Sequence, residues 1–164
     1  MARWTYSVGG ENITITGSNT LVGIMPPAAP SVGIRILKAW CSQYSTATSQ
    51  QVGIKHVTQV TAFPTVTSTT PVKEQTQNPN ASVITGAATI AAGKSGINAS
   101  AEGAGAKTTI FADSFNNLNG YFWNPGPVGA IELPAGSASS YGLVLLSTPS
   151  TLTGWTFGIE FEEF

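Results

Sequence analysis

The chain has 164 residues, of which 41% are hydrophobic and only 9% are charged, with 7 Lys and Arg against 8 Asp and Glu. A single domain of this length buries about 70% of its unfolded surface, so its core needs neither disulfides nor metal ions. The even charge balance excludes binding to nucleic acid through a basic surface, no apolar run reaches the roughly 18 residues of a membrane span, and the N-terminal residues predict no secretory signal.

The first predicted element is a β-hairpin. Apolar and polar residues alternate over residues 4–8, as in a strand with one buried face. The pair Gly9-Gly10 follows and is typical of a tight turn. A second strand through Ile13 and Ile15 would complete the hairpin.

The next strands are separated by Pro and Gly. A strand over residues 20–25 ends at two consecutive prolines, whose missing N–H donors stop a β-ladder. Over residues 32–44 the alternation slips by one position, which indicates a bulge or a strand covered on both faces. We expect this strand to pair with residues 51–61, in which His56 lies in an apolar row.

The middle of the chain differs in composition. Residues 64–106 contain no Phe, Trp or Tyr and are rich in Thr, Ala, Gly and Ser. We expect long connections here with one weak strand near residues 82–90, ordered in part by neighbours in an assembly.

Five further strands are predicted after this segment. They cover residues 108–115, 120–123, 130–133, 141–147 and 153–162. The strand over residues 141–147 has apolar residues on both of its faces, which suits a central strand covered on each side. The last alternates cleanly and predicts a buried face formed by Trp155, Phe157, Ile159 and Phe161, with the other face solvated.

Together these elements define the fold class. The sequence predicts an all-β, single-domain antiparallel β-sandwich over residues 1–164, jelly-roll-like, with the loop-rich segment at residues 64–106. Its surface is unusual, because ordinary soluble domains carry about 25% charged residues. Interfaces between subunits are less charged than free surface, so the composition favours a component of an assembly.

The residues that could carry chemistry are few. His56 is the only histidine and Cys41 the only cysteine, so neither a hydrolytic triad nor a zinc site can be built around them. We expect His56 to be a hydrogen-bonded core or interface residue and Cys41 a small buried apolar residue. Glu160 and Glu162 point the same way from one strand, which favours a solvated face or an intersubunit contact over the acid pair of a glycosidase. The sequence predicts no enzyme, no cofactor and no metal site.

One aromatic segment leaves two interpretations open. Residues 120–127 end an apolar strand in a loop rich in Pro and Gly. Trp123 could stack on a sugar ring there. It could equally be a core aromatic beside a tight turn, which is the interpretation we favour.

Several motifs, spread over most of the chain, follow the strand order of a known family. They are Gly33-Ile-Arg-Ile-Leu-Lys38, Gln51-Val-Gly-Ile-Lys55, Asp113-Ser-Phe-Asn-Asn, Gly120-Tyr-Phe-Trp-Asn-Pro125 and Phe161-Glu-Glu-Phe164, together with the N-terminal hairpin and the middle segment rich in Thr, Pro and Ala. This pattern resembles the capsid decoration (cement) proteins of tailed bacteriophages and their prophage relatives.

The resemblance implies a structural protein made in the host cytoplasm. Such a protein forms a homotrimer on the outer surface of the virion head, where its partner is the major capsid protein, and it stabilises the shell by bridging neighbouring capsomers. It implies no catalytic residue, no nucleic-acid partner and no membrane partner. A carbohydrate-binding or fibre module of a virion is the alternative.

We expect interface residues in three places. Trp4 and Tyr6 would pack an N-terminal arm, the segment of Met25, Pro26 and Pro27 would cap a sheet edge, and the loop after the aromatic strand would contact a neighbour. The candidates in that loop are Trp123, Asn124, Pro125 and Pro127. A core position is an equally good expectation for the aromatic residues.

Overall fold

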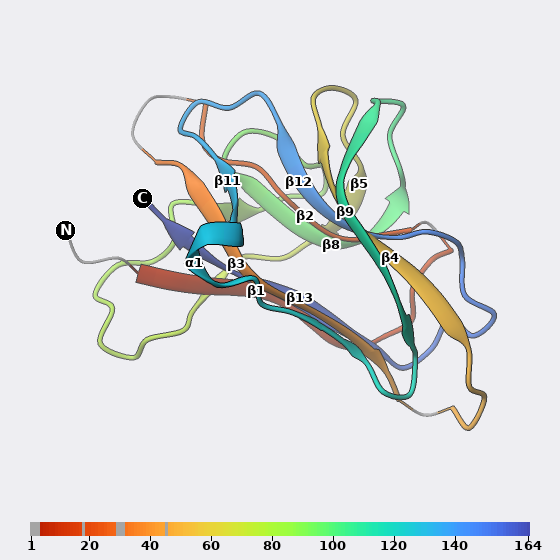
Figure 1. Ribbon diagram of the computed structural model, residues 1–164. Coiled ribbons are helices and arrows are strands. Elements are labelled where there is room, and N and C mark those ends of the chain that lie inside the picture. The colour runs from red at the N-terminus through yellow and green to blue at the C-terminus, as the bar shows by residue number, and fades with distance from the viewer. Residues whose placement is uncertain (1–3, 18, 29–31, 45) are drawn as a thin grey trace.

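Two β-sheets pack face to face in the computed structural model, which describes residues 4–17, 19–28, 32–44 and 46–164 (Figure 1). Sheet A has the strand order β10 (Tyr121–Trp123), β3 (Ile34–Gln43), β13 (Trp155–Glu163), β1 (Trp4–Ile13) and β6 (Val72–Lys73), and β11 (Ile131–Leu133) also pairs with β3. Sheet B has the order β5 (Thr65–Ser68), β8 (Lys94–Ala101), β2 (Thr20–Ile24), β12 (Ser140–Leu145), β4 (Gln51–Gln59) and β9 (Lys107–Asn116), with the short β7 (Thr85–Gly86) parallel to β8. The helical turn α1 (Gly126–Gly129) lies between β10 and β11.

The main strands follow the connectivity of a jelly roll. Sheet A contains the path β1-β13-β3-β10 and sheet B the path β2-β12-β4-β9. The chain crosses between the sheets at nearly every step, and only β4 and β9 are successive main strands in one sheet. Two four-stranded sheets joined in this way form the double-sheet jelly roll. The predicted all-β, antiparallel, jelly-roll-like sandwich is therefore confirmed.

The core between the sheets follows the sequence patterns. All four predicted apolar residues of β13 are fully buried: Trp155, Phe157, Ile159 and Phe161. All six residues of β12 are buried, as expected for a central strand covered on both sides. The predicted bulge is also present, because Leu37 has no partner at the point where the β3–β13 register shifts.

Two predicted strand pairings are wrong. β1 runs without a turn from Trp4 to Ile13, and Gly9 lies opposite Gly158 of β13. Neither Gly9 nor Gly10 has a positive φ, so the glycine pair continues the strand next to a partner from the far end of the chain. The strand over residues 51–61 does not pair with β3, since β4 belongs to sheet B.

The segment over residues 64–106 is more ordered than its composition suggests. The weak strand expected near residues 82–90 is reduced to the two-residue β7, and the main strand of the segment is β8, which pairs with β2. Above this part of sheet B lies a second, smaller apolar cluster formed by Met25, Val66, Ile90 and Ala99 with Phe63 and Ala92. This part of the segment therefore covers the outer face of sheet B, whereas β6, also within the segment, pairs with β1 in sheet A.

The end of this segment is held by one carboxylate. Glu102 accepts hydrogen bonds from the backbone N–H of Thr20 (2.7 Å) and from its hydroxyl (2.6 Å), and it pairs with Lys107 at the start of β9. Desolvation raises the pKa of Glu102, but the hydrogen bonds from Lys107 and Thr20 outweigh it and hold the pKa below its ordinary value. Glu102 thus joins the ends of β2 and β9 most strongly when it is ionised.

The variant Glu102→Gln is expected to lower the free energy of unfolding at pH 7 by about 1–2 kcal/mol, because hydrogen bonds to a charged group are replaced by weaker ones. Urea unfolding measures the loss. Glu11→Gln is the matched control, since Glu11 is exposed and has no hydrogen-bond partner among the described residues. Equal stability of the two variants would contradict a role for Glu102 in joining the strands.

Candidate functional site

Two edge strands lie on the same side of the sandwich. β9 ends sheet B and β10 ends the β3 side of sheet A, and the two are joined by residues 117–120. Beyond β4, no other described strand pairs with β9. We call the surface formed by β9, residues 117–120, β10 and α1 the open flank.

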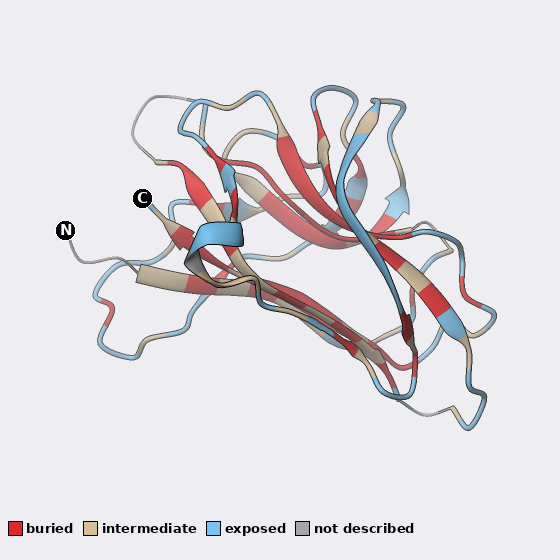
Figure 2. Ribbon diagram, in the orientation of Figure 1, coloured by how far each residue is buried: buried red, intermediate tan, exposed pale blue. Residues whose placement is uncertain are grey.

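The open flank exposes apolar side chains. β9 is exposed without interruption over residues 108–114, and Figure 2 shows it pale blue along almost its whole length. Phe122 of β10 is 65% exposed and Val128 of α1 is fully exposed. The large exposed apolar residues of this surface are Ile110, Phe111, Leu118, Phe122 and Val128. Phe122 is paired with Trp40 in sheet A, whereas Ile110 and Phe111 lie on the edge strand of sheet B, so the exposed apolar residues are spread over both sheets along this side. Exposed apolar surface marks a site of contact with another molecule.

Few charges protect this surface. In the described part of the chain, the open flank carries only Lys107 and Asp113, and Lys107 already pairs with Glu102. Natural edge strands are usually protected by charged residues, by prolines or by bulges that twist the edge away. β9 has one such device, a register shift at Ile110 opposite the step from His56 to Val57. The flank is therefore suited to being covered by a protein surface.

A hydrogen-bonded group lies directly beneath the open flank. His56 of β4 is fully buried, with its Nε2 atom 2.9 Å from the Tyr121 hydroxyl and its Nδ1 atom 2.7 Å from the Tyr141 hydroxyl. Tyr121 belongs to β10 in sheet A and Tyr141 to β12 in sheet B. This arrangement confirms His56 as a hydrogen-bonded core residue and ties the two sheets together.

Burial keeps this group neutral. Desolvation lowers the pKa of His56 to about 4. Desolvation also raises the pKa of Tyr121, with the charge of nearby Asp113 adding to the effect, and it raises the pKa of Tyr141. A neutral imidazole has one donor and one acceptor, so one tyrosine accepts a hydrogen bond from His56 while the other donates one. Both ring nitrogens are used, which leaves neither for a metal ion or a substrate.

The predicted loop candidates lie in the open flank (Trp123 and Pro127) or between its two elements β10 and α1 (Asn124 and Pro125), and they differ in burial. Trp123 is half-buried, packs against the main core, and its ring centroid is 4.6 Å from that of His56. Asn124 is exposed and Pro125 is half-buried. Pro127 lies in α1, and its side chain is outside the described residues.

The other predicted candidates are elsewhere. Tyr6 is buried in the core and Trp4 packs against it, and both border a surface groove of about 520 Å³. Met25 and Pro26 are buried and Pro27 is half-buried. Because β2 lies between β8 and β12, these three residues follow an interior strand, and the expectation that they cap a sheet edge is wrong. The structure does not bring the three groups of candidates together.

The carboxylates of β13 are also placed differently from expectation. Glu160 is half-buried with an oxygen 2.6 Å from Lys38 Nζ, and Glu162 is buried with an oxygen 3.3 Å from Arg35 Nη1. Arg35 also pairs with Glu132. The prediction that Glu162 lies on a solvated face is therefore wrong, because ion pairs between neighbouring strands cover the outer face of sheet A around this residue.

Sequence reasoning missed the most exposed residues of the flank. Phe122 lies between Tyr121 and Trp123 on a three-residue strand, and the two neighbours face inward. The period of two in a β-strand then requires Phe122 to point outward, and this signal was available in the sequence. For Val128 and Ile110, no pattern in the neighbouring sequence predicted that the side chain would be exposed.

The described part of the chain contains neither a cluster of metal-binding side chains nor a membrane-spanning helix. No group of three or more His, Cys, Asp or Glu side chains there is close enough to bind a metal ion. None of the described helices is long and apolar enough to cross a membrane.

The fold and the open flank define a class of protein: a jelly-roll sandwich with one uncovered apolar side. Comparisons of the chain with known protein families, curated proteins and solved structures give no significant match. The functional conclusion therefore depends on the residues of this chain, because one fold supports many functions.

Proposed function

We propose that this protein is a capsid decoration (cement) protein of a tailed bacteriophage. It binds the outer surface of the head as a homotrimer, contacts the major capsid protein and bridges neighbouring capsomers. The role is structural and not catalytic. The observation that carries the proposal is the open flank, which presents Ile110, Phe122 and Val128 to solvent beside a ten-residue edge strand.

The charge distribution supports an assembled state. The chain has only 15 charged residues, and ion pairs within the chain already use Arg35, Lys38 and Lys107. Repulsion between copies is therefore small. On a symmetric shell the same weak apolar contact repeats many times, and avidity gives the assembly its strength.

Carbohydrate binding through Trp123 has less support. The ring of Trp123 packs against His56 and the main core, so it is not free to act as a platform for a sugar. A flat aromatic face open to solvent is needed for stacking on a pyranose.

The direct test is binding to a phage shell. Purified protein is mixed with expanded, undecorated heads, and bound copies are counted by cryo-electron microscopy. We expect density at symmetric positions on the outer surface and increased resistance of the shell to heat. Analytical ultracentrifugation of the free protein tests the trimer separately. A protein that stays monomeric and binds none of a panel of shells would overturn the proposal.

A further inference from the structure

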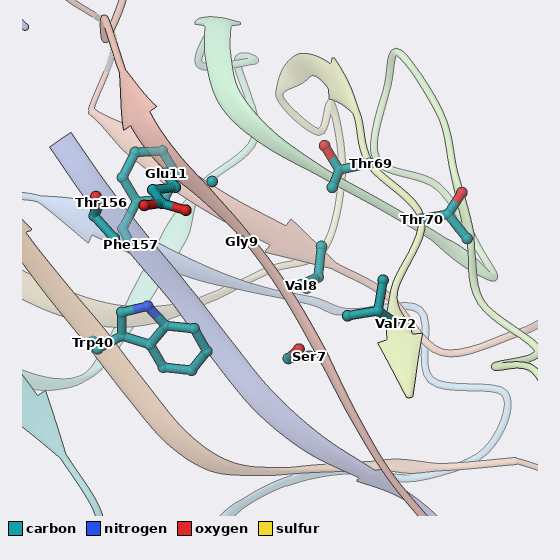
Figure 3. A pocket seen from close by; sticks show the side chains of 11 residues that line it. Ser7, Val8, Gly9, Glu11, Trp40, Thr69, Thr70, Val72, Thr156 and Phe157 are labelled. Carbon is teal, nitrogen blue, oxygen red and sulfur yellow. The ribbon is translucent and has the colours of Figure 1, made fainter. Parts of the chain in front are cut away.

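A second surface feature lies on the outer face of sheet A and adjoins the open flank at Trp40, which is the cross-strand partner of Phe122. It is a groove of about 330 Å³ across β1, β13 and β3, walled on one side by residues 69–72 (Figure 3). This volume falls at the lower end of the roughly 300–1,000 Å³ range of small-molecule sites. We call it the Trp40 groove.

The floor of the Trp40 groove consists mainly of backbone. Trp40, Gly158 and Gly9 lie in one register row across β3, β13 and β1. A Cβ atom added at Gly158 would lie 2.3 Å from Cζ2 of the Trp40 indole, so the ring occupies the space above this glycine. Figure 3 shows the indole reaching from β3 over β13. Gly158 thus allows an aromatic ring to lie along the sheet, whereas a Cβ at Gly9 would meet the backbone of β13.

Polar groups border this ring. Glu11, Ser7 and Thr156 line the groove beside Trp40, and Thr69 and Thr70 line the opposite wall. Among the described residues, neither the Glu11 carboxylate nor the Ser7 hydroxyl has a hydrogen-bond partner, and the Nε1–H of Trp40 has no acceptor. One carboxylate, an indole N–H and a hydroxyl are thus available to a ligand in one place.

We propose that the Trp40 groove binds a neutral saccharide about the size of a disaccharide. The C–H face of a sugar ring stacks on the indole, as apolar surface does on an aromatic ring. Sugar hydroxyls donate to the carboxylate of Glu11 and accept from the Nε1–H of Trp40, and hydrogen bonds to a charged group are the stronger kind. Among the residues that the structure describes, Glu11 is the only charged one lining the groove, so an acidic saccharide is repelled.

This inference goes beyond the proposed function and does not depend on it. The Trp40 groove extends from Trp40 across β13 and β1 to residues 69–72, whereas the open flank lies on the other side of Trp40, from Phe122 outward. A saccharide site on the exterior of a virion would add attachment to a sugar-coated surface. Loss of sugar binding and loss of shell binding are measured separately.

The test follows the indole N–H signals of the full chain by 1H–15N NMR. Lactose, cellobiose, maltose and mannobiose are the neutral probes, and digalacturonate is the acidic one. We expect at least one neutral disaccharide at millimolar concentration to shift the Trp40 signal, which Trp40→Phe identifies by removing it. Digalacturonate should leave the signal unchanged.

Three variants locate the site. Because Trp40→Ala has no Trp40 signal, isothermal titration calorimetry with the neutral probe that binds measures the affinity of each variant. Trp40→Ala and Gly158→Ala should each weaken binding roughly tenfold or more, equivalent to about 1.4 kcal/mol, because one removes the ring and the other displaces it. Glu11→Gln changes an exposed residue, leaves the fold intact and should also weaken binding. Trp123→Ala is the matched control and should bind as the wild type does.

The outcomes are distinct. Weaker binding by Glu11→Gln and Trp40→Ala, with unchanged binding by Trp123→Ala, supports the proposal. It is overturned if no neutral probe shifts the Trp40 signal, if digalacturonate binds as well as the neutral sugars, or if only Trp123→Ala loses binding. Thermal melting of each variant distinguishes loss of the site from loss of the fold.

Discussion

The protein is expected to lose about 3 kcal/mol of folding free energy between pH 7 and pH 4 through His56 alone. The pKa of His56 is about 4 in the folded state, against 6.5 for an unperturbed histidine. Between these two values the unfolded chain binds a proton that the folded chain does not. The contribution of His56 is therefore complete above pH 6.5 and is lost as the pH falls through this window.

The structural cause is the position of His56 between the two sheets. A proton on the ring turns both nitrogens into donors, and the tyrosine hydroxyl that had donated to the ring must reorient in a buried site. The imidazolium would also be buried, and within the described part of the chain its hydrogen-bond partners are the two tyrosines and not a carboxylate. Acid should therefore loosen β10 from sheet B, beginning at Tyr121.

Urea unfolding at several pH values, compared with His56→Gln, isolates this effect. The amide of Gln can donate to one tyrosine and accept from the other, but it does not titrate. Carboxylates that titrate near pH 4 are common to both proteins and cancel in the comparison. We expect the variant to lose much less stability than the wild type between pH 6.5 and pH 4.5. Parallel curves would show that His56 does not carry the pH dependence.

The double variant Ile110→Lys with Phe122→Asp is expected to leave the protein folded and to abolish its assembly. Both side chains are exposed, so the cost to the folded monomer is small. In an assembly they would place unpaired charges in an apolar interface. Self-association and shell binding should each weaken by roughly 100-fold or more.

A matched control distinguishes the open flank from exposed apolar surface in general. Val83 is 50% exposed and lies outside the flank, so Val83→Lys makes a similar change at a similar exposure. Sedimentation should show monomers for the double variant and trimers for both the control and the wild type. If Val83→Lys dissociates the trimer and the double variant does not, the interface lies elsewhere.

Patterns of apolar and polar residues within single strands predicted much of the fold, because they follow directly from which faces of a strand are buried. The alternation in β13, the two-sided apolar pattern of β12 and the phase slip at Leu37 all correspond to what the structure contains. Each of these signals lies within one strand. The number and order of strands in the second half of the chain followed from the same reasoning.

Pairing between distant strands was not predictable in the same way. Gly9 and Gly10 resemble a turn when read locally, yet β13, from the other end of the chain, keeps them extended. β8 gave a weak signal because small and polar residues surround its one large apolar residue, Ile97. β8 is an interior strand because it pairs with β2 on one side and β5 on the other. The sequence of β8 alone does not show these pairings.

The candidate site was predicted in part. The loop after β10 was identified, but Trp123 was preferred there and Phe122 is the exposed aromatic. The Trp40 groove was not predicted at all, since it depends on a glycine of another strand, Gly158, lying in register with Trp40. Bulk and aromaticity alone do not distinguish a core residue from a surface one.

The connection between β4 and β9 has a consequence for how this protein can change. Gln59 and Lys107 are direct partners in one ladder, so the intervening chain leaves and rejoins sheet B at adjacent points. The stretch cannot be exchanged as a whole, because β8 within it pairs with β2, and Ile84 and Ile97 belong to the main core. Its exposed turns carry neither role, and exposed turns of this kind tolerate insertions. Foreign peptides could therefore be displayed at these turns without moving the eight main strands.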